Sequence, residues 1–466
     1  MKRNPSETQA PPTSATAKTA KTVAIVGGGA SGTLVAARLL ASPACRNGRL
    51  KVLHIERDAE IGKGIAYSTT ASFHYLNVRR DKMSAFPEDP AHFSRWVGRR
   101  YPATPIADFQ PRTRYAEYLR ELLEEARSAA PTEAYASVRD RVTGFVRRSD
   151  GRLELATESG TAIVCHRLVV ATGHRPPGVP EGLREIRGSA RFIVDPWVAG
   201  ELAKIGANEA VLVVGSGLTA VDTVLSLMHA GHATTIDGVS RRGLSPLSHP
   251  ESESEFDVPL PLSDERPRGV LRALRVAADR AGDRWPEVVD RFRPEIHRIW
   301  AKWTVRERGS FLRHARAYWE VHRHRVAPAV FREWNDYRAA GKTRFFAGRV
   351  LAAVEEKKGI RVRIARRDGG AEEKRYDRIV NCTGGEPDLS LFEPGIYAAD
   401  PNGVGLPTDG AGHPLRRDGK FESDVFVVGP SLRTLFWEMT AVPDLKNQAK
   451  VAVDALLAGL DVEPGN

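Results

Sequence analysis

Two glycine-rich turns carry the residue types whose spacing most clearly predicts chemistry. The first lies in VAIVGGGASG, residues 23–32, between an apolar stretch typical of a buried strand and a stretch with helical periodicity. There Gly27 permits a tight bend, Gly29 lets the backbone approach a pyrophosphate, and Gly32 lets the helix pack closely on the strand. Ser31 and the free N–H groups of the helix start then face the phosphates. The pattern predicts a dinucleotide site.

An acidic residue completes this first site. The next apolar stretch, LKVLHIE, ends at Glu56, 29 residues beyond Gly27. A carboxylate at the end of that strand accepts hydrogen bonds from both hydroxyls of an adenosine ribose. Together with the strand and helix, Glu56 makes a chance glycine turn a poor explanation. The acid-ended site favours FAD.

The second turn repeats the pattern with a different ending. It lies in VVGSGLTAVD and supplies Gly215, Gly217 and Ala220. The strand that follows ends not in an acid but in Ser240, Arg241 and Arg242. A guanidinium at this position suits the 2′-phosphate of an adenosine, which an acid would repel. This site therefore favours NADPH, with NADH as the alternative and two surface arginines in a turn as the plain interpretation.

Later strands repeat as well. RLVVATGH (167–174) and RIVNCTGG (378–385) each follow a β-rich stretch and each end in a Thr-Gly pair, Thr172 and Gly173 in the first case. DVFVVGP brings one more strand to Gly429, and a helix is expected near Val442, with its N-terminus aimed at the flavin. This internal duplication predicts an α/β fold with two Rossmann-like, three-layer nucleotide-binding domains, small antiparallel β inserts and a helical insertion.

The domain boundaries follow from these motifs. We expect a disordered tail over 1–21, a first part of the FAD-binding domain over 22–200, an NAD(P)H-binding domain over 205–384 with a helical insert at 245–345, and the second part of the FAD-binding domain over 385–460. In the insert, an aromatic stripe at helical spacing favours core packing over a binding face, and Pro286 and Pro294 mark expected helix starts.

A basic cluster at 322–325 reads either as a cationic patch for an anionic substrate or as an exposed helix end. We take Arg323, His324 and the aromatic Trp437 as candidate catalytic residues. An arginine would hold an anion, and a histidine with a pKa near neutral would act as acid or base.

Composition limits the remaining classes. The 466 residues are 41% hydrophobic and 27% charged, with a net charge of +11 from arginines scattered among acids. That scatter argues against nucleic acid as a partner, and no apolar run is long enough to span a membrane. Three distant cysteines indicate a reducing, cytoplasmic setting and no metal site. A homo-oligomer stays open.

From these motifs, the chain resembles the two-dinucleotide-domain flavoproteins from about residue 22 to 460. Residues 62–97 and 437–449 resemble a bacterial group of FAD/NAD(P)-binding proteins that includes an FAD-dependent urate hydroxylase. Two features depart from the wider class. Gly429 is followed by Pro430 instead of the usual aspartate, and the paired cysteines of disulfide reductases are absent.

The resemblance implies an FAD-dependent NAD(P)H monooxygenase, with a small molecule and O₂ as partners. The flavin, reduced by NAD(P)H, would form a hydroperoxide that hydroxylates a small anionic ring, with urate converted to 5-hydroxyisourate as the favoured case. The alternatives are an amino-acid N-hydroxylase, an NAD(P)H dehydrogenase that passes electrons to a quinone-like acceptor, and a non-catalytic FAD-binding redox sensor.

Overall fold

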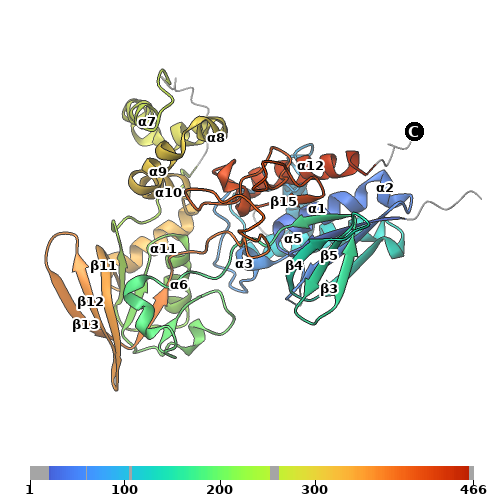
Figure 1. The fold of residues 1–466 in the computed structure, drawn as a ribbon. Coiled ribbons are helices and arrows are strands. Elements are labelled where there is room, and N and C mark those ends of the chain that lie inside the picture. Colours follow the sequence, from blue (N-terminus) through green and yellow to red (C-terminus); the bar gives the residue numbers. More distant parts are fainter. Residues whose placement is uncertain (1–19, 59, 104–107, 252–261, 461–466) are drawn as a thin grey trace, which may run out of the picture.

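The computed structural model describes residues 20–58, 60–103, 108–251 and 262–460 (Figure 1). Nearly all of the expected tail lies outside these ranges, and Lys21 already belongs to the first strand. The fold is the expected mixed α/β fold, built on two sheets whose central strands run parallel.

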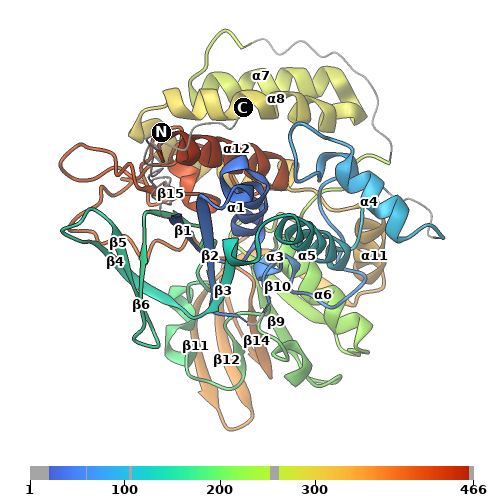
Figure 2. The same cartoon turned by 90° about the vertical axis from the view of Figure 1, so that its right-hand side faces the viewer.

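The first sheet joins the two ends of the chain. Its strands, in spatial order, are β15 (Val425–Val427), β7 (Arg167–Val170), β1 (Lys21–Val26), β2 (Leu50–Glu56) and β3 (Tyr135–Arg139). The helices α1 (Ala30–Ala41), α5 (Arg112–Ser128) and α12 (Val442–Ala458) pack together against it (Figure 2). The shorter helices of this half are α2 (Pro43–Arg46), α3 (Gly64–Tyr67) and α4 (His92–Arg100). Because Val23, Ala24 and Ile25 are wholly buried, β1 forms the centre of the core.

The second sheet holds seven strands. Their spatial order is β13 (Ala371–Tyr376), β12 (Gly359–Arg366), β11 (Thr343–Glu356), β10 (Ile236–Ser240), β9 (Val211–Val214), β14 (Arg378–Asn381) and β8 (Phe192–Ile193). Helix α6 (Leu218–His229) follows β9. Because β8 pairs with β14, the chain enters this sheet before residue 200.

The two β inserts are built differently. The first is a separate antiparallel sheet of β4 (Val142–Arg147), β5 (Leu153–Thr157) and β6 (Ala162–Cys165). The second is no separate sheet. Strand β11 is 14 residues long, so it pairs with β10 in parallel and then extends to pair with β12 in antiparallel.

The insert is helical as expected. It contains α7 (Pro267–Ala281), α8 (Trp285–Lys302), α9 (Val305–His314), α10 (Arg316–Arg323) and α11 (Pro328–Ala339). Pro286 lies in the first turn of α8, but Pro294 lies inside the same helix, so the expected helix start at Pro294 is wrong. The flanking Phe292 and Ile296 are buried in the aromatic core of the insert, and this packing holds the helix across the proline.

The segment after β15 connects the insert to the first sheet. It contains the short 3₁₀ helix η6 (Pro430–Thr434) and then α12. In Figure 1 this red segment lies between the yellow insert helices and the first sheet. Within the described residues, no helix is long and apolar enough to cross a bilayer, and no cluster of three or more potential metal ligands occurs.

Candidate functional site: two dinucleotide cavities and the seam between them

The first glycine turn has the geometry that its spacing predicts. Gly27 has φ +111°, and a Cβ there would lie 2.3 Å from the carbonyl oxygen of Ala171. A Cβ on Gly32 would lie 1.9 Å from the carbonyl oxygen of Gly27. Gly29 differs from both, because its nearest neighbour would be the Cα of Gly64 at an ordinary 3.7 Å. Protein packing thus requires Gly27 and Gly32, whereas the space beside Gly29 stays open for a ligand.

A cavity of about 480 Å³ opens at this turn. It is lined by Gly27, Gly29, Ser31, Glu56, Thr172, Gly173 and His174, with Pro430, Thr440 and Leu445 from the C-terminal segment. Glu56 accepts a hydrogen bond from the amide of Gly28 at 2.5 Å and another from Asp58 at 3.0 Å. The expected cofactor residues Gly429 and Val442 shape this region without lining the cavity. Gly429 has φ +85° beside Ser31, and Val442 is a buried residue at the start of α12.

His174 lines the same cavity. Burial and, to a smaller extent, the charge of Arg433 lower the pKa of His174 to about 4. The imidazole is therefore neutral at physiological pH. A positive charge at His174 does not contribute to anion binding there.

The second turn has nearly the same backbone geometry as the first. Gly215 has φ +114°, and a Cβ there would lie 2.4 Å from the carbonyl oxygen of Cys382. A Cβ on Gly217 would meet nothing within 4 Å. The third position is Ala220, which is fully buried. The turn again leaves its middle glycine open toward a ligand.

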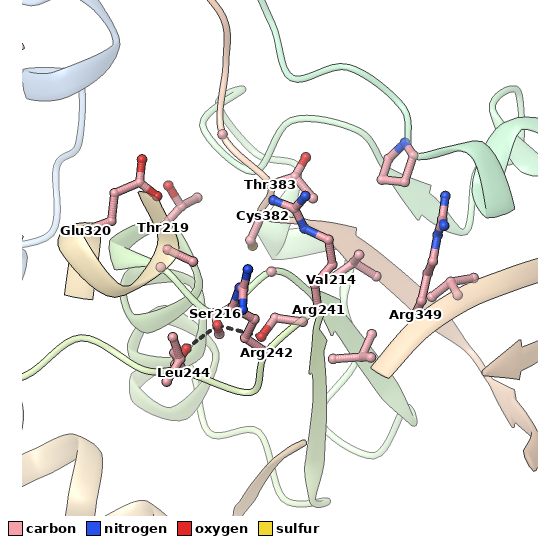
Figure 3. A pocket seen from close by; sticks show the side chains of 18 of the residues that line it. Val214, Ser216, Thr219, Arg241, Arg242, Leu244, Glu320, Arg349, Cys382 and Thr383 are labelled. Carbon is pink, nitrogen blue, oxygen red and sulfur yellow. Dashed lines mark hydrogen bonds between the residues drawn. The ribbon is translucent and has the colours of Figure 1, made fainter. Parts of the chain in front are cut away.

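The second cavity, of about 790 Å³, is the larger of the two (Figure 3). It is lined by the second turn, by Arg241, Arg242 and Arg349, by Cys382 and Thr383 after β14, and by Arg316, Glu320 and His324 from the insert. Ser216 donates a hydrogen bond to the carbonyl of Leu244, and its hydroxyl is also hydrogen-bonded to the hydroxyl of Ser240 at 2.8 Å (Figure 3). A hydroxyl pair thus occupies the place where a carboxylate would repel a phosphate.

The two predicted arginines have different surroundings. Arg242 donates to the carbonyls of Arg313 and His314 at 3.1 and 3.3 Å, and its guanidinium lies 4.9 Å from the ring centroid of Tyr318. It therefore ties the turn to the insert. Arg241 is exposed and makes no hydrogen bond or ion pair with any described residue. Its charge remains available to a ligand in the cavity.

The three candidate catalytic residues lie close to one another at the seam, which is the contact between the end of α10 and residues 437–438. His324 lines the second cavity, and burial lowers its pKa. Trp437 is buried against Trp300, with ring centroids 4.7 Å apart. Arg323 is 4% exposed, and its Nε lies 3.1 Å from the carboxylate of Glu438.

This placement corrects the expectation of a free cationic patch. The charge of Arg323 is matched by Glu438, which also accepts a hydrogen bond from Trp319 at 2.7 Å. The neighbouring Arg325 is completely buried and paired with Asp290. Both arginines are therefore paired with carboxylates of the chain, since a buried arginine needs a carboxylate within reach. Neither charge is free to bind an anionic ligand.

Arg433 was missed by sequence reasoning. It lies in η6, its Nε is buried without a hydrogen-bond partner, and its guanidinium stacks 4.3 Å from the ring centroid of Trp437. Its position four residues after Gly429 was a weak signal, because the chain contains many arginines near glycines.

Comparisons with known families agree with both turns. A family model described as FAD-NAD(P)-binding matches residues 24–175, which hold the first turn. A model described as L-lysine 6-monooxygenase/L-ornithine 5-monooxygenase matches residues 108–256, which hold the second. No curated protein sequence matches the chain.

Solved structures share the whole fold. The L-lysine 6-monooxygenase of Pseudomonas syringae has a TM-score of 0.66 at 17% identity, covering 94% of this chain and 99% of its own. The cadaverine monooxygenase of Erwinia amylovora gives 0.64 at 14%, covering 94% of each chain. The ornithine hydroxylase of Pseudomonas aeruginosa gives 0.62 at 17%, covering 95% of this chain and all of its own. At these identities the likeness establishes the fold, which is that of the two-dinucleotide-domain flavoproteins.

Proposed function

We propose that this protein is an FAD-dependent NADPH monooxygenase that hydroxylates the nitrogen of a primary amine. The observation that carries the proposal is the second complete glycine turn with the unpaired Arg241 in its cavity, inside a segment that matches the lysine and ornithine monooxygenase family model. A second turn gives the chain its own coenzyme site beside the flavin site.

The residues present fit the two cofactors. Gly29 leaves open space where a pyrophosphate approaches, and Glu56 stands where the FAD ribose hydroxyls belong. Arg241 and the Ser216–Ser240 hydroxyl pair suit a 2′-phosphate, which supports NADPH over NADH. When bound, FAD supplies the hydride acceptor and the reaction with O₂.

The overall reaction balances as amine, O₂, NADPH and a proton giving hydroxylamine, water and NADP⁺. One oxygen atom forms the new N–O bond, the other leaves as water, and NADPH supplies the two electrons. The task of the chain is to hold both cofactors, to exclude water at the seam and to orient a neutral amine nitrogen. The buried aromatic cluster around Trp437 and Trp300 suits the exclusion of water.

Amine N-hydroxylation, an alternative at the sequence level, receives more support than urate hydroxylation. The family model over 108–256 and the three solved structures described above are named for amine substrates. No comparison points to urate. The hypothesis of an anionic ring substrate also depended on a free cationic patch, and Arg323 of that patch is paired with Glu438.

A substrate screen tests the proposal. Purified protein with FAD is mixed with NADPH in air, and O₂ uptake is followed with L-lysine, L-ornithine, cadaverine, putrescine or urate. We expect an amine to raise O₂ uptake several-fold and a hydroxylamine to accumulate. If urate alone is consumed, or if only quinones accept electrons from NADPH, amine hydroxylation is wrong.

A further inference from the structure

We propose that Arg433 binds an anionic group of the substrate and so selects amines that carry a carboxylate over plain diamines. This inference rests on the proposed amine hydroxylation and concerns the substrate class of the same site. Arg433 lies in η6, directly after the strand that ends at Gly429, and Pro430 of the same helix lines the first cavity.

Arg433 lacks a partner in the described part of the chain. It makes no hydrogen bond or ion pair there, and its Nε is fully buried. Its one close polar interaction is the stack on Trp437, with 4.3 Å between the guanidinium carbon and the ring centroid. Arg433 as a whole is half-buried, but a guanidinium nitrogen that is buried without a hydrogen-bond partner carries a desolvation cost. An anion from outside the chain would remove that cost.

Arg433 lines neither cavity, but it lies within electrostatic range of residues that line each of them. Its charge acts on His174, which lines the first cavity, while Arg316 and Glu320, which line the second, act on Arg433 in turn. Burial and then Arg316 lower the pKa of Arg433 to about 10, so the guanidinium stays charged at neutral pH.

The nearby Arg323 shows why Arg433 is the anion-binding arginine. Arg323 is buried and forms an ion pair with Glu438, whereas Arg433 is half-buried and feels Glu438 only through its charge, without an ion pair. The phosphates of the two dinucleotides belong at the glycine turns, where the helix N-termini face them. The anion that completes Arg433 is therefore a group of the substrate, held at the end away from the reacting nitrogen.

Two matched pairs of substrates test this assignment. L-lysine differs from cadaverine, and L-ornithine from putrescine, by the carboxylate. We expect kcat/KM for the amino acid to exceed that for its diamine at least tenfold. Arg433→Met should raise the KM for the amino acid and so bring this ratio close to one. Arg433→Lys, which keeps a positive charge, should restore part of the preference for the amino acid. The control Arg272→Met removes an exposed charge on α7 and should keep the ratio of the unmodified protein.

The assignment is wrong if the unmodified protein prefers the diamine, or if Arg433→Met lowers kcat/KM for both amines equally. A turnover-free measurement separates this failure from failure of the proposed function. Pentanoate, a carboxylate without an amine, is titrated against the flavin absorption spectrum. If no amine is hydroxylated but pentanoate binds at least tenfold more weakly to Arg433→Met, the anion site stands and amine hydroxylation fails. Equal pentanoate binding contradicts the anion site.

Discussion

In the first turn the amide of Gly27 donates to the carbonyl of Ile55, and in the second the amide of Gly215 donates to that of Val239, both at 2.9 Å. These two equivalent bonds let β2 and β10 be aligned residue by residue. The position after the acceptor is Glu56 in β2 and Ser240 in β10. The position before it is His54 in β2 and Gly238 in β10.

These two positions show how one backbone serves two ligands. Glu56 accepts a hydrogen bond from the amide of Gly28, whereas Ser240 is hydrogen-bonded to the hydroxyl of Ser216. The carboxylate of one site is thus a neutral hydroxyl in the other, with Arg241 next to it. The turn glycines set the approach of any dinucleotide, and the end of the second strand sets which dinucleotide is preferred.

The largest effects are expected at the first glycines, where the two turns should behave alike. Gly27→Ala and Gly215→Ala each place a methyl within 2.4 Å of a carbonyl oxygen at positive φ. We expect each to lower the free energy of unfolding by about 2–6 kcal/mol. Gly160→Ala is the control, because Gly160 has φ +84° with nothing within 4 Å, so only the backbone strain remains. Denaturant titration measures all three, and a cost at one turn only would break the equivalence.

The middle glycines should separate the two sites. Gly29 and Gly217 have negative φ and space for a methyl, so alanine at either position leaves the fold intact. Gly29→Ala should weaken FAD binding at least about tenfold, since the methyl meets the pyrophosphate. Gly217→Ala should keep FAD and raise the KM for NADPH by a similar factor. Full FAD content in purified Gly29→Ala would place the flavin elsewhere.

The first turn should make stability depend on pH through His54, which has no counterpart in the second turn. Its Nε2 lies 3.1 Å from the carbonyl oxygen of Gly27, and burial lowers its pKa to about 4. Unfolded histidine titrates near 6.5, so between these values the unfolded chain binds more protons and stability falls as the pH falls. The loss is up to about 3 kcal/mol, from about 1.4 kcal/mol per pH unit.

The measurement is the denaturation midpoint from pH 7 to pH 4. Other buried histidines also contribute to the slope, so the comparison is with His54→Gln, which keeps a donor for Gly27 and cannot titrate. We expect the variant to show a shallower dependence. Identical slopes would mean that His54 does not link the first turn to pH.

The smallest expected effects concern the coenzyme arginines. Arg241→Ala should narrow the preference for NADPH over NADH about tenfold or more, since a charge-assisted contact contributes about 1.5–3 kcal/mol. Arg242→Ala should narrow it less, because Arg242 is bound to carbonyls of the insert. Steady-state KM values for both coenzymes decide this. Equal use of NADPH and NADH by the unmodified protein would remove the basis of the comparison.

The sequence predicted the features that depend on local geometry. Glycine spacing, apolar strands and the residue after each second strand are local signals, and both turns, the central strands of both sheets and the helical insert were found from them. Side-chain partners across distant segments are not local signals. Glu438 lies 115 residues from Arg323, and nothing in the sequence indicates that it neutralises Arg323 and leaves Arg433 unpaired.

The insert shows the same limit. Its aromatic stripe was correctly favoured as core, but the periodicity does not indicate that Trp437 from the C-terminal segment completes that core. The helix start expected at Pro294 failed for a related reason, because burial of Phe292 and Ile296 outweighs the hydrogen bond that the proline removes.

Isotope transfer from O₂ tests the central claim most directly. The protein, with FAD and NADPH, is incubated under ¹⁸O₂ with the amine that most stimulates O₂ uptake, and the product is analysed by mass spectrometry. We expect a hydroxylamine that carries one ¹⁸O atom on nitrogen, formed in proportion to NADPH oxidised. If NADPH is oxidised while every amine is recovered unchanged, or if the product oxygen comes from water, the protein is not an amine monooxygenase.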